Sequence, residues 1–191
     1  MPMQPGRHTF GTDAGRITLR TGRDGLAAQA GHDLTIEAPR WTGELVLAAD
    51  LSPVSLTVKV DIAVLIVRDG SGGLRPLTDK DKREIAVTAR KVLSADRHPE
   101  LTFAATDFDA SPDGTGGTIT GTLTLAGQSR PQQLQVTQLA PERYLATTTV
   151  RQTDFGIKPY SGFLGALKVS DPVDVEVELN LGNAAEPEPP D

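Results

Sequence analysis

The sequence predicts an all-β fold, an antiparallel sandwich or barrel of about eight strands with one α-helix. Most longer segments alternate apolar and polar residues with period two, as half-buried strands do. These segments are short, evenly spaced and separated by turns that contain Gly and Pro. Helical spacing of apolar residues is clear in one stretch, residues 78–93. A barrel of about eight strands has room inside for side chains or for one ligand.

The first half of the chain predicts four strands after a flexible arm at residues 1–7. The alternating segments are 16–20, 31–37, 41–49 and 55–67. In the longest of them, Leu56, Val58, Val60, Ile62 and Val64 would share one face. The Gly-rich run at 68–73 that follows lacks the Lys-Ser/Thr of a phosphate-binding loop, so we interpret it as a flexible connector.

The helix is predicted between Thr78 and Leu93. Thr78 can cap the first amides, with Asp81 as a weak capping-box partner. Acidic residues lie in the first turn, and Arg90 and Lys91 lie in the last, as the helix dipole favours. The apolar stripe consists of Ile85, Ala89, Val92 and Leu93. We expect this stripe to lie at the open face or the mouth of the sheet.

The second half predicts further strands and a tail. Alternation indicates strands at 101–105, 119–125, 134–136, 144–150 and 173–181. The last of these is the clearest half-buried strand in the chain. Residues 183–191 are rich in Pro and Glu and predict a disordered tail, so the domain is expected to span residues 8–182.

Composition excludes several classes of function. The net charge is −6, with no basic run, so nucleic acid is not an expected partner. The chain has no cysteine and therefore no disulfide, thiol catalysis or Cys-ligated zinc. No segment approaches the roughly 18 apolar residues of a transmembrane helix. The N-terminus lacks the apolar core of a signal peptide, so we expect a cytoplasmic protein.

The sequence shows no catalytic or metal site. The three histidines, His8, His32 and His98, are not at ligand spacing. No serine lies in a G-x-S-x-G elbow, and Asp154-Phe155-Gly156 lacks the other motifs of a kinase. We therefore expect no enzyme activity, no metal and no cofactor.

Five segments in order resemble the YceI-like family, which is known for polyisoprenoid binding. They are Gly31–Leu34, Ser94–Phe103, Gly121–Pro131, Arg151–Ile157 and Val173–Leu179, and together they extend the resemblance over roughly residues 8–181. The resemblance implies an extended lipocalin-like antiparallel barrel with the helix near its mouth. It also implies an apolar ligand, such as an isoprenoid or a quinone-like lipid, inside the barrel. It carries over no catalytic residue. Relatives can dimerise, but the residues of this sequence do not determine whether the chain forms a homodimer.

The candidate binding residues follow from this implied function. The bulky side chains suited to line a cavity are Trp41, Phe103, Phe108, Phe155, Ile157 and Phe163, although they could equally fill it. His32 and Arg151 are head-group candidates. Arg151 could instead pair with an aspartate such as Asp154.

Three functions remain open at this point. The first is binding, storage or transport of an apolar lipid, which requires an open interior. The second is an enzyme acting on such a lipid, which requires a polar cluster inside the barrel. The third is a ligand-free interaction or stress-related module, which requires a solid core and an exposed apolar patch.

Overall fold

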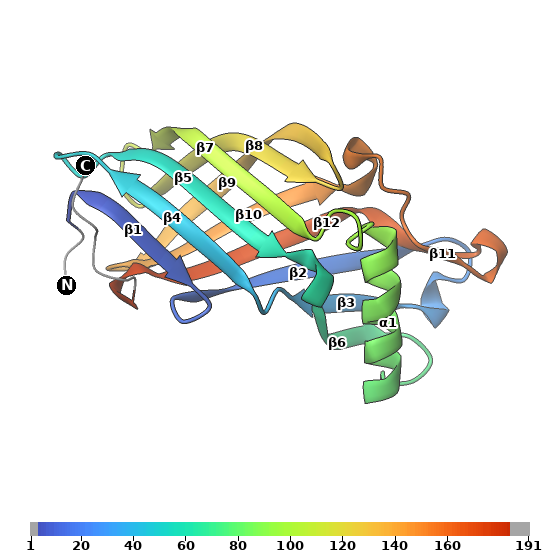
Figure 1. Cartoon of the computed structure of the whole chain (residues 1–191). Coiled ribbons are helices and arrows are strands. Elements are labelled where there is room, and N and C mark those ends of the chain that lie inside the picture. Colours follow the sequence, from blue (N-terminus) through green and yellow to red (C-terminus); the bar gives the residue numbers. More distant parts are fainter. Residues whose placement is uncertain (1–3, 184–191) are drawn as a thin grey trace.

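The computed structural model describes residues 4–183, which form one curled antiparallel sheet and one α-helix (Figure 1). The strands are β1 (Gly6–Gly11), β2 (Gly15–Asp24), β3 (His32–Glu37), β4 (Trp41–Leu47), β5 (Pro53–Asp61), β6 (Ile66–Gly72), β7 (Glu100–Ala110), β8 (Gly116–Leu125), β9 (Gln128–Ala140), β10 (Arg143–Arg151), β11 (Ser161–Gly162) and β12 (Leu167–Asn180). The helix α1 is Asp79–Val92. Short 3-10 turns are η1 (Ala28–Ala30), η2 (Ile62–Val64), η3 (Gln152–Phe155), η4 (Phe163–Gly165) and η5 (Leu181–Asn183).

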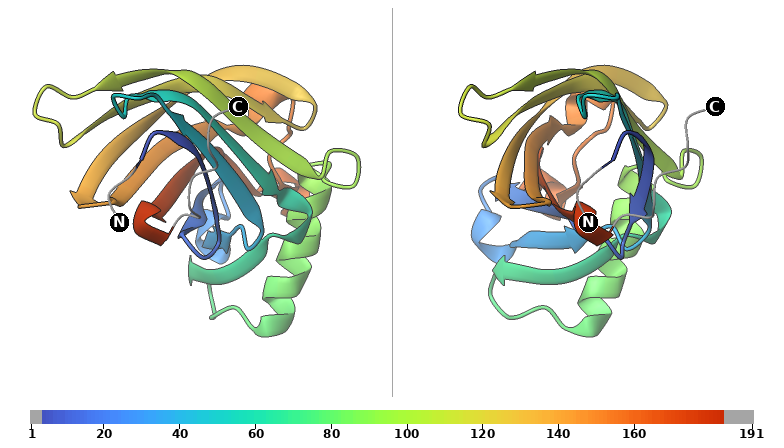
Figure 2. Two further views of the ribbon diagram at one scale, coloured as in Figure 1. Left: turned by 60° about the vertical axis from the view of Figure 1, so that its left-hand side comes forward. Right: turned by 90° about the vertical axis from the view of Figure 1, so that its left-hand side faces the viewer.

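The sheet is antiparallel throughout and curls around a common axis, as Figure 2 shows from two sides. Its strand order is β1-β4-β5-β7-β8-β9-β10-β12-β2-β3-β6, and the short β11 pairs with β12. Within residues 4–183 no pairing joins β1 to β6, so the barrel is not closed. The all-β class is confirmed. The predicted number of about eight strands is wrong, because the sheet has twelve.

Alternation along the strands decides which side chains face the inside of the curl. In β9, for example, Leu134 and Val136 are half-buried, whereas Gln133 and Gln135 between them are exposed. A strand directs successive side chains to opposite faces, so one row lines the interior and the other faces solvent. The long predicted strand at 173–181 follows the same rule as part of β12.

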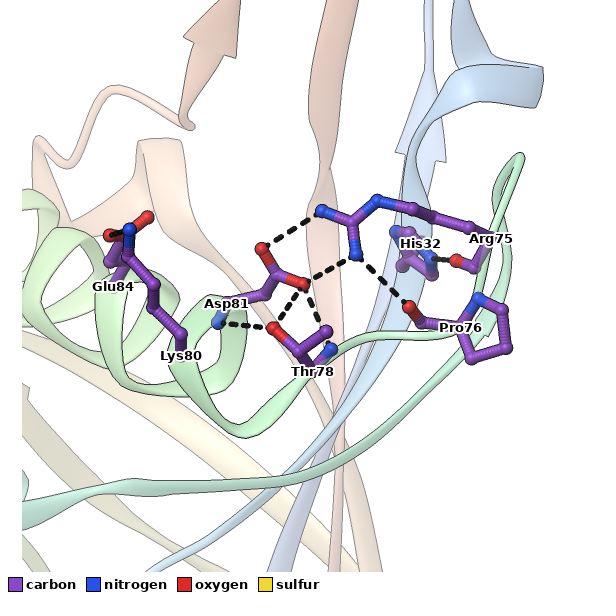
Figure 3. A network of polar contacts seen from close by, with 7 residues as sticks. All are labelled: His32, Arg75, Pro76, Thr78, Lys80, Asp81 and Glu84. Atoms are coloured by element: carbon purple, nitrogen blue, oxygen red, sulfur yellow. Dashed lines mark hydrogen bonds and ion pairs between the residues drawn. The ribbon is translucent and has the colours of Figure 1, made fainter.

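The predicted helix and its cap are confirmed. The Thr78 backbone amide donates to Asp81 Oδ2 at 2.8 Å, and the Asp81 amide donates to Thr78 Oγ1 at 3.2 Å, which completes a capping box. The Arg75 guanidinium donates to both Asp81 oxygens, at 2.8 and 3.1 Å (Figure 3). This network holds the start of α1 to the loop that precedes it. No helix within residues 4–183 is long and apolar enough to cross a bilayer.

The helix stands at one end of the curled sheet, beside β6 and η2 (Figure 1). Val92 and Leu93, from its predicted apolar stripe, pack against the hydrophobic core. The sequence predicts the open face or the mouth of the sheet for this stripe. In the structure, α1 contacts β6 and η2, at the end of the sheet opposite the β4–β5 turn (Figure 1).

The predicted strand at 55–67 is interrupted, which corrects the sequence interpretation. β5 ends at Asp61, and its carboxylate accepts a hydrogen bond from the Ala63 amide at 3.0 Å, which caps the turn η2. The chain then enters β6, which pairs with β3. Ile62 remains buried inside this turn. The period-two alternation of apolar residues therefore continues through η2, where the chain leaves β5 and changes direction. The alternation alone does not predict this turn.

The Gly-rich run at 68–73, predicted to be a connector, belongs largely to β6. Its glycines are required by close packing and by backbone conformation. A Cβ on Gly73, which has a φ of +73°, would lie 2.9 Å from His32 Cδ2. A Cβ on Gly70 would lie 3.1 Å from Leu77 Cγ. The glycines thus let β6 approach β3 and the loop before α1.

The N-terminal strand begins inside the predicted arm. Gly6 is the first residue of β1 and pairs with Leu47 of β4. Phe10, further along β1, forms an edge-to-face contact with Trp41, with ring centroids 6.1 Å apart and planes at 68°. The predicted tail, apart from Asn183, lies outside the described residues.

Candidate ligand-binding cavity

The curled sheet encloses a cavity of about 500 Å³. This volume falls within the range of about 300–1,000 Å³ that small-molecule sites usually have. Its wall is formed by the inward rows of nine strands together with adjoining turns. The lining side chains are almost all apolar; they include Phe10, Ile17, Leu19, Trp41, Leu45, Leu47, Leu56, Val58, Val60, Leu101, Phe103, Phe108, Ile119, Leu123, Leu134, Val136, Ala146, Val150, Val175, Val177, Leu179 and Leu181. Within residues 4–183, no charged side chain borders it.

The inward-facing side chains are only partly buried, although they point into the barrel. Leu56 and Val58 of β5 and Val175 and Val177 of β12 all have this intermediate exposure. A filled core would bury such residues almost completely. Their remaining exposure is to the cavity, so the interior is open rather than solid.

The cavity opens at the turn between β4 and β5. Leu51 lines the cavity and is also 48% exposed, so it lies at the boundary between the interior and solvent. It has a positive φ of 67°, and its amide donates to the Ala48 carbonyl across the turn. Figure 1 shows this turn at the far left, at the opposite end of the sheet from α1.

A small polar group interrupts the apolar wall. It consists of Gln132 on β9 and Thr148 on β10, both of which line the cavity. Gln132 Nε2 donates to Thr148 Oγ1 at 2.6 Å and to the Thr149 carbonyl at 3.1 Å. Tyr144 also borders the cavity, and its hydroxyl is 3.4 Å from Gln138 Nε2.

A second hollow, of about 440 Å³, adjoins the first near the turns β1–β2 and β3–β4. Its lining includes charged residues of both signs, among them Arg16, Glu37 and Glu178. Arg68 donates to both Glu37 oxygens, at 2.8 and 3.1 Å, and this contact is the main cause of the lowered pKa of Glu37; burial opposes it. The mixed charges make this hollow less suitable than the apolar cavity for a lipid chain.

Trp41, Tyr144 and Leu179 border both spaces. Trp41 is 4% exposed, and its Nε1 is a buried donor with no hydrogen-bond partner in the described part of the chain. The indole therefore lies, with Tyr144 and Leu179, between the apolar cavity and the polar hollow. Its position makes it a natural reporter of what enters the cavity.

The candidate residues chosen from the sequence divide into two groups in the structure. Trp41, Phe103 and Phe108 line the cavity. Phe155 and Ile157 are 2% and 5% exposed and belong to the packed core, but neither borders the cavity. The side chain of Phe163 lies outside what the structure describes.

The two head-group candidates lie away from the cavity. The His32 Nε2 atom is 2.7 Å from the Arg75 carbonyl, in the loop before α1 (Figure 3). The Arg151 guanidinium pairs with Asp171 at 3.8 Å, rather than with the suggested Asp154. Asp171 also accepts hydrogen bonds from Thr153, which lower its pKa. Both candidates therefore have structural partners in this conformation.

Sequence reasoning missed most of the cavity wall, because it selected bulky residues. The wall is largely aliphatic, with rows such as Leu56-Val58-Val60 on β5 and Val175-Val177-Leu179 on β12. The signal for these residues was present, because the alternation itself identifies the inward row. No sequence feature identified Gln132 and Thr148 as cavity residues, other than that they are polar residues on the inward rows.

Within residues 4–183, no group of three or more His, Cys, Asp and Glu residues is arranged to hold a metal ion. The cavity also lacks a charged side chain that could act as acid or base. Its wall is apolar apart from the polar atoms of Gln132, Tyr144, Thr147, Thr148 and Trp41.

Solved structures with a similar fold come from several bacteria. BcnA of Burkholderia cenocepacia is 14% identical, with a TM-score of 0.61 over 90% of this chain and 96% of that one. A YceI protein of Campylobacter jejuni is 17% identical, with a TM-score of 0.57 over 81% and 85%. A polyisoprenoid-binding domain from Saccharophagus degradans, implicated in plant cell wall breakdown, is 11% identical, with a TM-score of 0.53 over 92% and 97%. At these identities the similarity shows the fold alone.

The sequence itself identifies the family. No curated protein matches it significantly. The model of the YceI-like domain, however, matches residues 17–181. This range includes nearly all of the sheet, the helix and the residues around the cavity. The chain therefore belongs to the YceI-like family.

Proposed function

We propose that this protein binds an apolar lipid of isoprenoid type within its barrel and stores or carries it without chemical change. The observation that carries this proposal is the cavity of about 500 Å³ with an apolar wall and an opening at Leu51. The description of the Saccharophagus degradans domain as polyisoprenoid-binding is consistent with such a ligand.

The energetics favour an apolar chain. Burying about 600 Å² of ligand surface at about 25 cal/mol per Å² would contribute about 15 kcal/mol before the costs of association. Each half-buried side chain on the wall, such as Val58 or Val177, would also lose its remaining exposed surface on binding. No ion pair is needed for this energy.

The experiment is organic extraction of the purified, unheated protein followed by mass spectrometry. We expect a stoichiometric isoprenoid or related lipid, or uptake of one after incubation with candidate lipids. An extract without lipid, together with no uptake, would contradict the proposal and favour the ligand-free interaction module. A matched sample denatured before incubation controls for lipid that adheres to exposed apolar surface.

A further inference from the structure

The side-chain amide of Gln132 has one orientation that satisfies its neighbours. Its Nε2 lies 3.1 Å from the Thr149 carbonyl, which can only accept a hydrogen bond. The same atom lies 2.6 Å from Thr148 Oγ1, whose proton is donated to the Gln133 carbonyl at 2.8 Å. The nitrogen of the amide must therefore face these two acceptors, and the oxygen must face away from them.

This orientation leaves Gln132 Oε1 as an acceptor without a donor. The atom has no hydrogen-bond partner among residues 4–183. Gln132 lines the cavity, on the inward row of β9 with Leu134 and Val136. A carbonyl oxygen that loses its water without gaining a donor is costly, so a ligand made of hydrocarbon alone would be penalised at this position.

We propose that Gln132 Oε1 accepts a hydrogen bond from a hydroxyl group on the bound lipid. This inference rests on the proposed function and specifies its ligand: an uncharged, long-chain alcohol or phenol. A quinone or an ester offers only acceptors and cannot satisfy Oε1. A carboxylate or phosphate would place a negative charge near Oε1, where no cationic side chain within the described residues lines the cavity.

The position of Gln132 also orients the ligand. Gln132 lies near the start of β9, just after the turn from β8. At this turn, a Cβ on Gly127 would lie 2.9 Å from His98 Cε1, so the turn is next to the loop that follows α1. The β4–β5 turn, which contains Leu51 and the opening, lies at the other end of the sheet (Figure 1). The hydroxyl group therefore lies deep, and the hydrocarbon tail extends toward the opening.

The test compares three probes of matched shape: geranylgeraniol, its methyl ether and the corresponding hydrocarbon. Affinities are measured by isothermal titration with the full-length protein. We expect the alcohol to bind about tenfold more tightly than the ether, because one satisfied hydrogen bond contributes a factor of this order. Equal affinities for the alcohol and the ether would overturn the inference. If none of the three probes binds, the proposed function fails as well.

Variants test whether the preference for the alcohol over the ether depends on Gln132. In Gln132→Leu the alcohol and the ether are expected to bind equally, and the hydrocarbon is expected to bind at least as tightly as before. Gln135→Leu is the matched control: Gln135 is on the same strand, but it lies on the solvent-exposed face and does not border the cavity. It should keep the tenfold preference. A preference that survives in folded Gln132→Leu would overturn the inference, and the comparison of probes on the unmodified protein stands even if that variant does not fold.

Discussion

Phe10 lies directly across from Gly43 in the β1–β4 ladder, and its ring covers the glycine. A Cβ on Gly43 would come within 2.8 Å of Phe10 Cδ2 and closer still to the outer ring atoms. The same ring meets Trp41 edge to face. The absence of a side chain at Gly43 is therefore what lets an aromatic pair form one side of the cavity wall.

Gly43→Ala is expected to destabilise the protein by about 1–3 kcal/mol, because the new methyl group displaces the Phe10 ring. The free energy of unfolding from urea titration measures this. In a Phe10→Ala background the same change should cost less than about 0.5 kcal/mol, since the clash is absent. Equal costs in both backgrounds would show that the ring is not what excludes the side chain.

Val58→Trp is expected to abolish lipid uptake. Val58 is half-buried on the inward row of β5, so an indole at this position would occupy the cavity. The neighbouring Thr57→Trp places the same indole on the other face of the strand and should leave uptake unchanged. Lipid per protein after extraction is the measurement. Because the cavity has space for the added atoms, the melting temperature of Val58→Trp should not fall. Normal lipid content in a folded Val58→Trp would exclude this cavity as the site.

Asp81→Asn is expected to reduce stability at neutral pH but not at low pH. Hydrogen bonds from Arg75 and Thr78 hold the pKa of Asp81 well below its usual range. A carboxyl whose pKa is lowered by folding stabilises the protein above its unfolded pKa of about 4, and that contribution is lost as the pH falls toward the folded value. The difference in melting temperature between the two proteins should therefore shrink below about pH 4.

Asp79→Asn provides the control for this pH dependence. Asp79 lies in the same first turn of α1 but is not part of the capping box. Its replacement should change the melting temperature less than Asp81→Asn does at neutral pH. An Asp81→Asn difference that stays constant from neutral to low pH would refute the assigned role of the carboxylate.

Local signals made part of this fold predictable. The helix at 79–92 follows from a cap and an apolar stripe that are all within one segment. The alternation at 173–181 likewise identifies the inward row of β12. The break at Asp61 was not predictable, because Ile62 and Val64 continue the alternation through η2. Pairing of the Gly-rich 68–72 segment with β3 depends on residues more than thirty positions earlier in the chain.

The sequence predicted an apolar cavity inside the barrel, but only some of the residues that line it. Trp41 and Phe103 fall on inward rows and line the cavity. Phe155, in η3, is instead packed within the hydrophobic core. Whether a large apolar side chain fills space or borders it depends on the volume left by all its neighbours. A sequence pattern gives the direction of a side chain, not the volume remaining opposite it.

The most direct test of the central claim uses Trp41, which is the single tryptophan of the chain and borders the cavity. Its fluorescence is measured during titration with a long-chain prenyl alcohol brominated along its tail, and then with the unbrominated alcohol as competitor. A lipid inside the barrel predicts saturable quenching that the competitor reverses. Iodide in the water should quench little, because Trp41 is 4% exposed. Unchanged fluorescence while the brominated lipid binds would place the lipid outside the barrel and contradict the account.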